Sequence, residues 1–227
     1  MTKFYQVGGS VRDKVMGVKS KDIDYAVETT SFDAMREAII QLGGKIFVET
    51  PKFFTIRALV PDYGACDYTL CRRDGVYTDG RRPDSVEIGN LASDLARRDF
   101  TMNAIALEPI TDTYIDPYQG LTDIENKLIR CVGDATQRFQ EDKLRVFRAV
   151  RFVVTKDFSI ENDTAFAIGE VHDFSGVSTE RIIVELEKMF AVNLDKSLDL
   201  LMIAFPNLWS IILERHIGFK PTMPKTS

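Results

Sequence analysis

The 227-residue sequence has few side chains that form disulfides or bind soft metals: three cysteines and two histidines. So sparse and odd a cysteine set excludes a disulfide framework, and with two histidines it also excludes a four-ligand zinc site. No apolar run approaches the about 20 residues needed to span a bilayer, so we expect no membrane partner. No charged and then apolar leader opens the chain, so we expect no signal peptide and a reducing, cytoplasmic location.

Positive charge is not in excess either. Lysine and arginine number 29 against 34 aspartates and glutamates, which gives a net charge of −5. This balance argues mildly against a nucleic-acid partner, because such domains tend to be basic. Charge can still be local, since arginines gather in two short segments: Arg72, Arg73, Arg81, Arg82, Arg97 and Arg98 in one, and Arg138, Arg145, Arg148 and Arg151 in the other.

Apolar residues are plentiful. They make up 44% of the chain and include 15 phenylalanines and 7 tyrosines, which is enough for a core and excludes global disorder. Residues 1–133 mix strand and helix patterns, whereas residues 134–227 are almost wholly helical in pattern. We therefore predict an α/β domain over residues 1–133 and an all-helical domain over residues 134–227.

The patterns also predict individual elements. The expected strands are residues 4–7, 23–27, 45–49, 53–60, 65–71 and 128–132. The expected helices are residues 31–42, 91–107, 143–154, 163–171, 179–192 and 194–204. Ser10 is expected to cap a short helix that Gly17 ends. Residues 72–85 lack periodicity and are rich in charge and glycine, so we expect a loop.

Three aspartates are candidates for a metal site. Asp22 and Asp24 open the second strand, and side chains at i and i+2 of a strand share a face. Two carboxylates on one face can share a hard cation such as Mg²⁺. Asp67 lies within an apolar strand, where a carboxylate is costly unless it is paired or bound to metal. A solvated strand edge would give the same pattern.

The turn Gly8-Gly9-Ser10 lies between a strand and a helix. Such a turn directs backbone N–H groups and a helix N-terminus at an anion, and a triphosphate is a natural guest. Arg12 follows within reach of the same anion. The plainer interpretation is that the two glycines only make a turn.

Two further groups combine donors and acceptors. Arg97, Arg98 and Asp99 lie in the expected helix 91–107, where a solvated face is the alternative. Asp142 and Arg145 are spaced as neighbours on another expected helix. A carboxylate that accepts and a guanidinium that donates can together recognise the hydrogen-bonding edge of a base. An intrahelical salt bridge is the alternative.

Five motifs occur in a fixed order: residues 8–13 (GGSVRD), 21–24 (KDID), 97–104 (RRDFTMNA), 116–123 (DPYQGLTD) and 141–152 (EDKLRVFRAVRF). In this order they resemble the class II tRNA nucleotidyltransferase and poly(A) polymerase family of the DNA polymerase beta superfamily. The resemblance is close over residues 3–155. It implies a polymerase-beta-like α/β head with a mixed sheet, followed by a helical neck, with the family's body and tail domains largely absent.

The resemblance also implies roles for particular residues. It assigns catalysis to Asp22, Asp24 and Asp67, with metal held by Asp22 and Asp24. It assigns nucleotide binding to Gly8, Gly9, Ser10, Arg12, Arg97, Arg98, Asp99, Asn103, Asp142, Arg145, Arg148 and Arg151. Within this set, Asp142 and Arg145 would pair with the base, Asp99 would lie near the ribose, and Arg148 and Arg151 would bind phosphate.

The implied activity is addition of CCA to the 3′ end of tRNA from CTP and ATP, with release of pyrophosphate and catalysis by two Mg²⁺ ions. Residues 72–85 resemble the flexible loop of CCA-adding members, which favours CCA over CC-only addition. Poly(A) polymerase, CC-only and A-only addition, and an inactive RNA-binding relative remain alternatives. Without the body and tail domains we expect weak binding of tRNA, unless a partner or a dimer contributes. We expect the chain to be a monomer or a homodimer.

Overall fold

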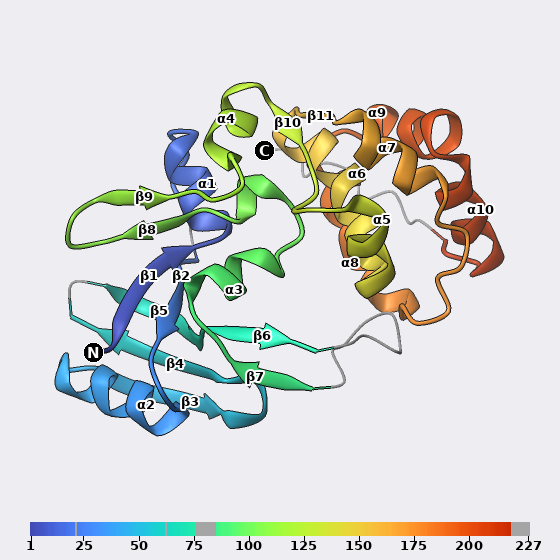
Figure 1. Cartoon of the computed structure of the whole chain (residues 1–227). Helices are drawn as coiled ribbons and strands as arrows, with labels where there is room; N and C mark the ends of the chain where they lie inside the picture. Colours follow the sequence, from blue (N-terminus) through green and yellow to red (C-terminus); the bar gives the residue numbers. More distant parts are fainter. Residues whose placement is uncertain (21, 62, 76–84, 219–227) are drawn as a thin grey trace, which may run out of the picture.

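The computed structural model describes residues 1–20, 22–61, 63–75 and 85–218. Its centre is a seven-stranded sheet in the order β3-β4-β5-β2-β1-β8-β9 (Figure 1). The strands are β1 (Lys3–Val7), β2 (Asp24–Glu28), β3 (Lys45–Thr50), β4 (Thr55–Val60), β5 (Gly64–Leu70), β8 (Ala106–Glu108) and β9 (Thr113–Ile115). Strands β2 and β5 pair in parallel and the other neighbours are antiparallel, so the expected mixed sheet is confirmed.

Two helices cover opposite faces of this sheet. Helix α2 (Phe32–Gln41) begins where the Ser31 side chain accepts a hydrogen bond from the Ala34 N–H. It buries Met35 and Ile39 against one face, in a cluster with Ile56 and other alternate residues of β2, β4 and β5. Helix α3 (Leu91–Ala96) packs on the other face, over Tyr5, Ala26 and Cys71.

The expected helix over residues 91–107 is confirmed for residues 91–96 and wrong beyond them. Helix α3 ends at Ala96, and a single 3₁₀ turn, η2 (Thr101–Asn103), leads into β8. Between them Phe100 forms an isolated antiparallel bridge to Cys131, and its ring is fully buried. The apolar spacing of residues 97–107 resembles that of a helix, but these residues are buried in a turn. Pairing with a distant segment outweighs local helix propensity here.

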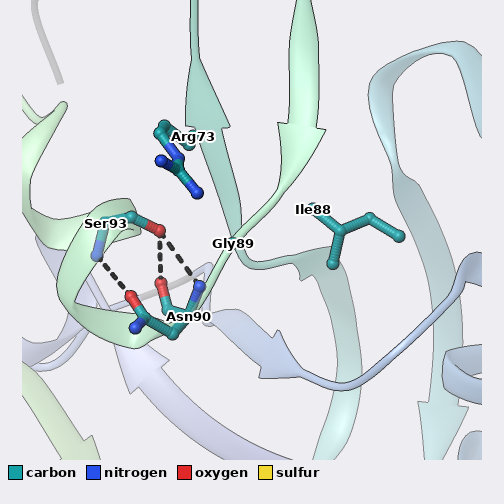
Figure 2. A pocket seen from close by; sticks show the side chains of 5 residues that line it. All are labelled: Arg73, Ile88, Gly89, Asn90 and Ser93. Carbon is teal, nitrogen blue, oxygen red and sulfur yellow. Dashed lines mark hydrogen bonds between the residues drawn. The ribbon is translucent and has the colours of Figure 1, made fainter.

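The expected loop over residues 72–85 begins as a hairpin. Strands β6 (Arg72–Asp74) and β7 (Val86–Ile88) pair in antiparallel register. Residues 76–84 of this predicted loop lie outside the described residues. Beside the hairpin is an open hollow lined by Arg73, Ile88, Gly89, Asn90 and Ser93, in which Asn90 and Ser93 cap the start of α3 reciprocally (Figure 2). None of the predicted site residues lines this hollow.

The second half of the described chain is helical except for one two-residue strand. The helices are α5 (Ala135–Glu141), α6 (Leu144–Lys156), α7 (Asn162–Gly169), α8 (Thr179–Phe190), α9 (Leu194–Asp199) and α10 (Pro206–Glu214), and a π-helical turn, η3 (Leu200–Ala204), follows α9. Strand β11 (Ser159–Ile160) pairs in parallel with β10 (Leu128–Ile129), which ties the two halves together.

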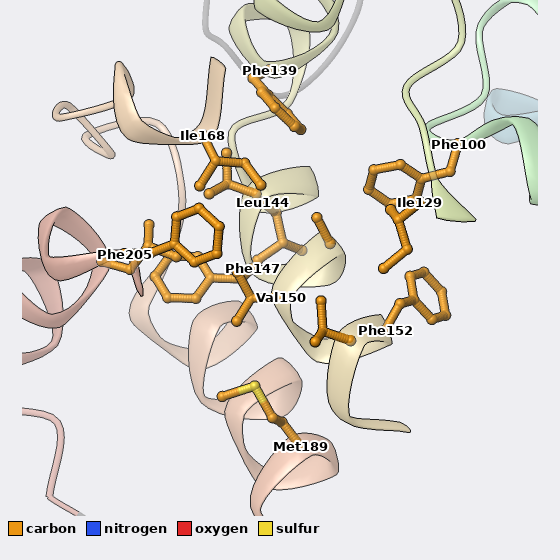
Figure 3. Packing of buried hydrophobic residues seen from close by; sticks show 14 of the residues in the cluster. Phe100, Ile129, Phe139, Leu144, Phe147, Val150, Phe152, Ile168, Met189 and Phe205 are labelled. Carbon is orange, nitrogen blue, oxygen red and sulfur yellow. The ribbon is translucent and has the colours of Figure 1, made fainter. Parts of the chain in front are cut away.

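Helix α6 is the centre of the largest apolar cluster. Its residues Phe147, Val150 and Phe152 are buried and pack both on later helices and on residues of the first half, such as Phe100 and Ile129 (Figure 3). The hydrophobic core is therefore continuous across Gly133, where strands give way to helices.

No single helix in the described ranges is long and apolar enough to cross a membrane. The segments Leu194–Ala204 and Pro206–Glu214 reach that length and composition only as a pair, and a bend of 102° separates them.

Candidate active site

Two of the predicted aspartates lie side by side on the central strands. Asp24, the first residue of β2, is in register with Asp67 of the parallel neighbour β5. On the other side of β2, Asp24 is opposite Val7, the last residue of β1. Residues in register on adjacent strands point to the same face, so the sheet brings both carboxylates to one surface beside the end of β1.

The surroundings of Asp24 oppose its ionisation. Desolvation raises the pKa of Asp24, and the carboxylates of Asp67 and Asp22 raise it further, while Arg98 and Arg57 act in the opposite direction. Like charges that raise a pKa in this way create a negative potential that a cation would relieve. The site therefore favours a cation on electrostatic grounds.

The three carboxylates are not arranged as metal ligands in this structure. Among the described residues, no group of three or more histidines, cysteines, aspartates and glutamates lies close enough to hold a metal ion. Asp67 is instead 3.4 Å from Nη1 of Arg57 on β4. This contact is long, half exposed and involves one carboxylate oxygen of Asp67, Oδ2.

The glycine turn is next to the carboxylates. Gly8 follows Val7 and has a φ of +72°, a conformation that glycine adopts without strain. A Cβ atom on Gly8 would lie 3.1 Å from Nη1 of Arg98. The two features together explain why glycine stands here: the backbone needs it, and Arg98 approaches closely.

The expected cap of the following helix is wrong. Helix α1 (Gly9–Val15) begins after Gly8, and Ser10 lies in its first turn. The Ser10 hydroxyl is buried and donates to the carbonyl of Val7, so it fastens the helix to the strand instead of capping it. The Gly9 position is also crowded, because a Cβ atom there would lie 3.3 Å from Nη2 of Arg12.

Arg12 is a buried arginine with a fixed position. Its Nη1 donates to Oδ1 of Asn103 at 2.7 Å, and its Nε and Nη2 donate to Asp13. The guanidinium also lies over the ring of Phe152, 5.1 Å from the centroid. These contacts join α1, η2 and α6, so the arginine beside the turn is positioned before any ligand binds.

Asp94, which the sequence interpretation did not select, holds the predicted arginine pair. It is almost fully buried in α3, and it accepts hydrogen bonds from Arg97 and from Nη2 of Arg98. Burial alone would raise the pKa of Asp94, but Arg98 and Arg97 outweigh it and the pKa is lowered. An acidic residue three and four positions before two arginines was the signal that could have identified it.

Asp99 connects the two halves of the chain. Its Oδ1 accepts from the Phe100 N–H and from Nδ2 of Asn103, and its Oδ2 accepts from Nε of Arg148 on α6 at 2.9 Å. Although burial would raise it, the ion pair with Arg148 and the Asn103 bond hold the pKa of Asp99 well below its usual range. The carboxylate is therefore charged and directed at α6.

Asp142 does not lie on a helix with Arg145, so that expectation is wrong. Its φ of −145° is extended, and it separates α5 from α6. Its Oδ1 accepts the Leu144 N–H, which begins α6, and its Oδ2 is 3.2 Å from Nη2 of Arg181. An aspartate that accepts an N–H near a helix start is favoured over a helical one.

Arg145 is buried and bonded to three segments. Its Nη1 donates to the Arg138 carbonyl and to Glu141, and its Nη2 donates to the Arg97 carbonyl. The expected alternative of an ion pair with Asp142 is not what forms; the partner is Glu141, a residue of the fifth motif to which the sequence interpretation gave no role. Arg145 thereby fixes the end of α3 against α5 and α6.

The predicted phosphate-binding arginines of α6 are paired with acids. Arg148 pairs with Asp99, and Arg151 pairs with Glu185 of α8. The guanidinium of Arg151 stacks 4.0 Å from the centroid of the Phe152 ring. Glu185 lies about 34 residues away along the chain, so no local sequence signal marks it.

The motif at residues 116–123 has a structural role. Asp116 accepts the N–H groups of Gly120 and Leu121, which begin α4 (Gly120–Glu125). Asp123 accepts the Thr101 hydroxyl at 2.6 Å. The motif thus fixes the η2 segment, from which Asn103 reaches Arg12 and Asp99.

Comparisons with known proteins show which family the chain resembles. The sequence profile of the poly A polymerase head domain matches residues 4–130. A CCA-adding enzyme of Geobacillus thermodenitrificans is 42% identical over 189 residues, which are 82% of this chain and 45% of that protein. One of Pediococcus pentosaceus is 43% identical over 81% of this chain and 45% of its own length. The chain therefore spans about half the length of the curated relatives it matches.

Solved structures show the same similarity. The Bacillus stearothermophilus CCA-adding enzyme in complex with CTP superposes with a TM-score of 0.74 and 35% identity, over 88% of this chain and 47% of that one. The Thermotoga maritima CCA-adding enzyme complexed with tRNA superposes with a TM-score of 0.75 and 28% identity, over 97% of this chain and 50% of that one.

Proposed function

Because the chain belongs to the poly A polymerase head domain family, we propose that it transfers nucleotides from CTP and ATP to the 3′ end of tRNA, releases pyrophosphate and so completes the CCA sequence. The observation that carries the proposal is the register of Asp24 with Asp67 beside the glycine turn and Arg98. The relatives that align with most of this chain are CCA-adding enzymes, which favours CCA addition over poly(A) synthesis.

The proposal includes divalent metal, with Mg²⁺ as the ion. The chemistry of the donors fits, since desolvation and the neighbouring carboxylates raise the pKa of Asp24, and hard cations prefer carboxylate oxygens. Asp22 and Asp24 would hold the metal, and Asp67 would join them after release from Arg57. When bound, the metal would lower the cost of forming the attacking oxygen and of releasing the leaving one.

The other residues position the reactants in this proposal. The Gly8–Gly9 turn supplies N–H groups for the triphosphate, with Arg98 and Arg12 beside it, and Ser10 holds the turn to β1. Asp99, fixed by Arg148 and Asn103, lies toward the ribose. Little covalent work falls to the protein in phosphoryl transfer, so positioning and charge carry the reaction.

Asp142 and Arg145 carry base selection in the proposal, at the start of α6. The contacts of Arg145 fix the orientation of its guanidinium, because Nη1 and Nη2 donate to two carbonyls and Glu141. The base would bind the guanidinium N–H groups that these contacts do not use. A donor and an acceptor in fixed positions can accept C and A while rejecting U and G. Arg97, Arg148 and Arg151 complete the cationic surroundings of the nucleotide.

The proposal also divides the chain into a head of residues 1–133 and a neck of residues 134–227, and it places the protein in the cytoplasm as a monomer or a homodimer. Three free, buried cysteines suit a reducing compartment.

Poly(A) polymerase is the second candidate, because the matching profile carries that name. The deciding experiment incubates the protein with tRNA lacking its CCA end and with one labelled nucleotide at a time, and products are sized on a gel. We expect two additions with CTP alone and one further addition with ATP. Long tails from ATP alone would replace CCA addition by poly(A) synthesis, and no addition of any nucleotide to any RNA would refute both.

A further inference from the structure

The line of residues that contains the aspartates continues to the edge of the sheet. Asp24 is in register with Asp67, Asp67 with Arg57, and Arg57 with Val48 of the edge strand β3. These four residues therefore form one row on one face. With adjacent strands about 4.8 Å apart, the row leads roughly 15 Å outward from Asp24.

The outer part of this row is exposed, although the strands beneath it are well packed. The side chain of Arg57 is 53% exposed, Val48 is 54% exposed, and Leu59, on the same face of β4, is 45% exposed. The alternate residues of β4, Ile56 and Ala58, are fully buried under α2. We call Val48, Arg57 and Leu59 the outer shelf.

The direction of the reaction relates the outer shelf to one reactant. In phosphoryl transfer the attacking and leaving oxygens lie roughly in line on opposite sides of the phosphorus. The triphosphate site of the proposed function is at Gly8 and Arg98, at the β1 side of Asp24, so pyrophosphate leaves on that side. The β5 side of Asp24, where the outer shelf begins, lies opposite the triphosphate, and we assign the attacking hydroxyl to that side.

We propose that the outer shelf binds the single-stranded 3′ end of the RNA acceptor, with Arg57 contacting its phosphate and Val48 and Leu59 packing against sugar and base. The inference rests on the proposed function and names the acceptor subsite of that same site. Proteins bind single-stranded RNA with cationic side chains along its backbone and with aromatic side chains under its bases. In the outer shelf the exposed Val48 and Leu59 provide the apolar surface instead. The Arg57–Asp67 pair is half exposed and 3.4 Å long, so a phosphate can replace Asp67 at little cost.

This arrangement gives Arg57 a single change of partner. In the free protein Arg57 neutralises Asp67; with RNA bound it turns to the phosphate and leaves Asp67 free for the reacting centre. The outer shelf also supplies a local cation in a chain whose net charge of −5 opposes RNA binding in general.

The test measures binding of a 5′-labelled RNA hairpin with a short unpaired 3′ end by fluorescence anisotropy across a salt series, without nucleotide. Arg57→Ala is expected to weaken binding about five- to tenfold. It should also reduce the slope of log affinity against log salt by about 0.7, the value for one phosphate contact on a single strand. Arg57→Lys keeps the charge and should retain the slope.

Matched controls lie on the opposite face of the same region. Arg36→Ala removes an exposed cation of α2 that pairs with Asp33 and Glu49, and it should leave the slope unchanged.

A second test variant lies on the outer shelf itself. Val48→Glu should weaken RNA binding by charge repulsion without changing a contact of Asp67. Ile40→Glu places the same charge on an equally exposed residue of α2, at 55% exposure, and should weaken it less.

Equal slopes for wild type and Arg57→Ala would overturn the proposal, as would equal effects of Val48→Glu and Ile40→Glu. A loss of CTP affinity in Arg57→Ala that matches the loss of RNA affinity would also overturn it, because it would assign Arg57 to the triphosphate. These outcomes differ from failure of the proposed function, in which the wild-type protein adds no nucleotide at all.

Discussion

Asp24 is unusual among the carboxylates of the site because its surroundings oppose its charge. A pKa raised by desolvation and by Asp67 and Asp22 means that ionised Asp24 lowers the stability of the folded state at neutral pH. This cost is removed as the pH falls and the group is protonated. The charge of Asp24 therefore does not stabilise the fold, which is consistent with the metal-binding role proposed for it.

Asp24→Asn is therefore expected to abolish nucleotide addition while the melting temperature at pH 7 stays equal or rises slightly. The amide removes the repulsion, but it also removes the charge that would hold metal in the proposed function. Turnover assays and thermal melting of the same preparation check both parts. Near-normal turnover would exclude Asp24 from the metal site, and a clear drop in melting temperature would show a structural role.

Asp99 is the opposite case. Its pKa is held below the usual range, so its charge stabilises the folded state above the ordinary carboxyl pKa and this contribution is lost as pH falls. Asp99→Asn should cost about 2–3 kcal/mol at pH 7, because a charged bond to Arg148 becomes a neutral one.

The difference in unfolding free energy between wild type and Asp99→Asn should shrink as the pH is lowered from about 5 toward 3. Urea unfolding of both proteins at several pH values measures it. A difference that is constant over this range would mean that Asp99 contributes by packing and not by charge.

At the scale of elements, the α3–η2 segment shows how a short motif depends on its neighbours. Gly120 begins α4 directly against this segment, and a Cβ atom there would lie 2.2 Å from the carbonyl oxygen of Thr101. The two atoms nearest to this Cβ atom, the carbonyl oxygen and carbon of Thr101, belong to the backbone, so the backbone itself would have to move.

Gly120→Ala is expected to destabilise the protein by about 2–4 kcal/mol. Because the displaced η2 segment carries Asn103, nucleotide addition should also fall in the folded fraction. Gly169→Ala, at a position where an added Cβ meets nothing within 4 Å, is the matched control and should leave both stability and activity nearly unchanged. Equal melting temperatures for Gly120→Ala and Gly169→Ala would contradict this account.

Arg145, at the junction of α5 and α6, has structural contacts and, in the proposed function, also selects the base. Arg145→Ala removes three hydrogen bonds from a buried site, so stability should fall by about 2–4 kcal/mol. In the proposed function it should also blur the choice among the four nucleotides, by roughly tenfold or more. Single-nucleotide incorporation assays below the melting temperature separate the two effects, and an unchanged preference would remove Arg145 from base selection.

The sequence predicted the elements better than the partners. Alternation and turn residues were enough for the strands around Asp24 and Asp67, and Ser31 marked the start of α2 correctly. The segment around Asp99 was predicted as helix because its apolar spacing is helical, but pairing of Phe100 with Cys131 decides its conformation. Glu185 could not be predicted, since an ion pair between distant segments leaves no local pattern. Asp94 could have been predicted, because it lies three and four residues before Arg97 and Arg98.

For the whole molecule, the continuous core has a consequence for unfolding. Phe152 of α6 meets Phe100 edge to face, 5.9 Å between centroids, so the sheet-bearing half and the helical half share their most buried contacts. Halves that share one core are expected to unfold together.

Urea unfolding followed by Trp209 fluorescence and by far-UV circular dichroism should therefore give coincident curves. Trp209 is the single tryptophan of the chain and lies on α10, far along the helical half, whereas circular dichroism reports on all elements. Phe152→Ala should shift both curves together, by about 3–5 kcal/mol. Two separate transitions would show that the halves are independent domains.

Strand β1 is completed from far along the chain: Gln6 pairs with Leu107 and Val7 with Ala106. A ribosome adds about 5–20 residues per second, so roughly 100 residues of synthesis, or about 5–20 s, separate the two partners. Throughout that time the nascent chain presents one side of β1 as an open sheet edge, which is a template for unwanted pairing. The glycine turn at the end of this strand is thus among the last parts of the sheet region to be enclosed during translation.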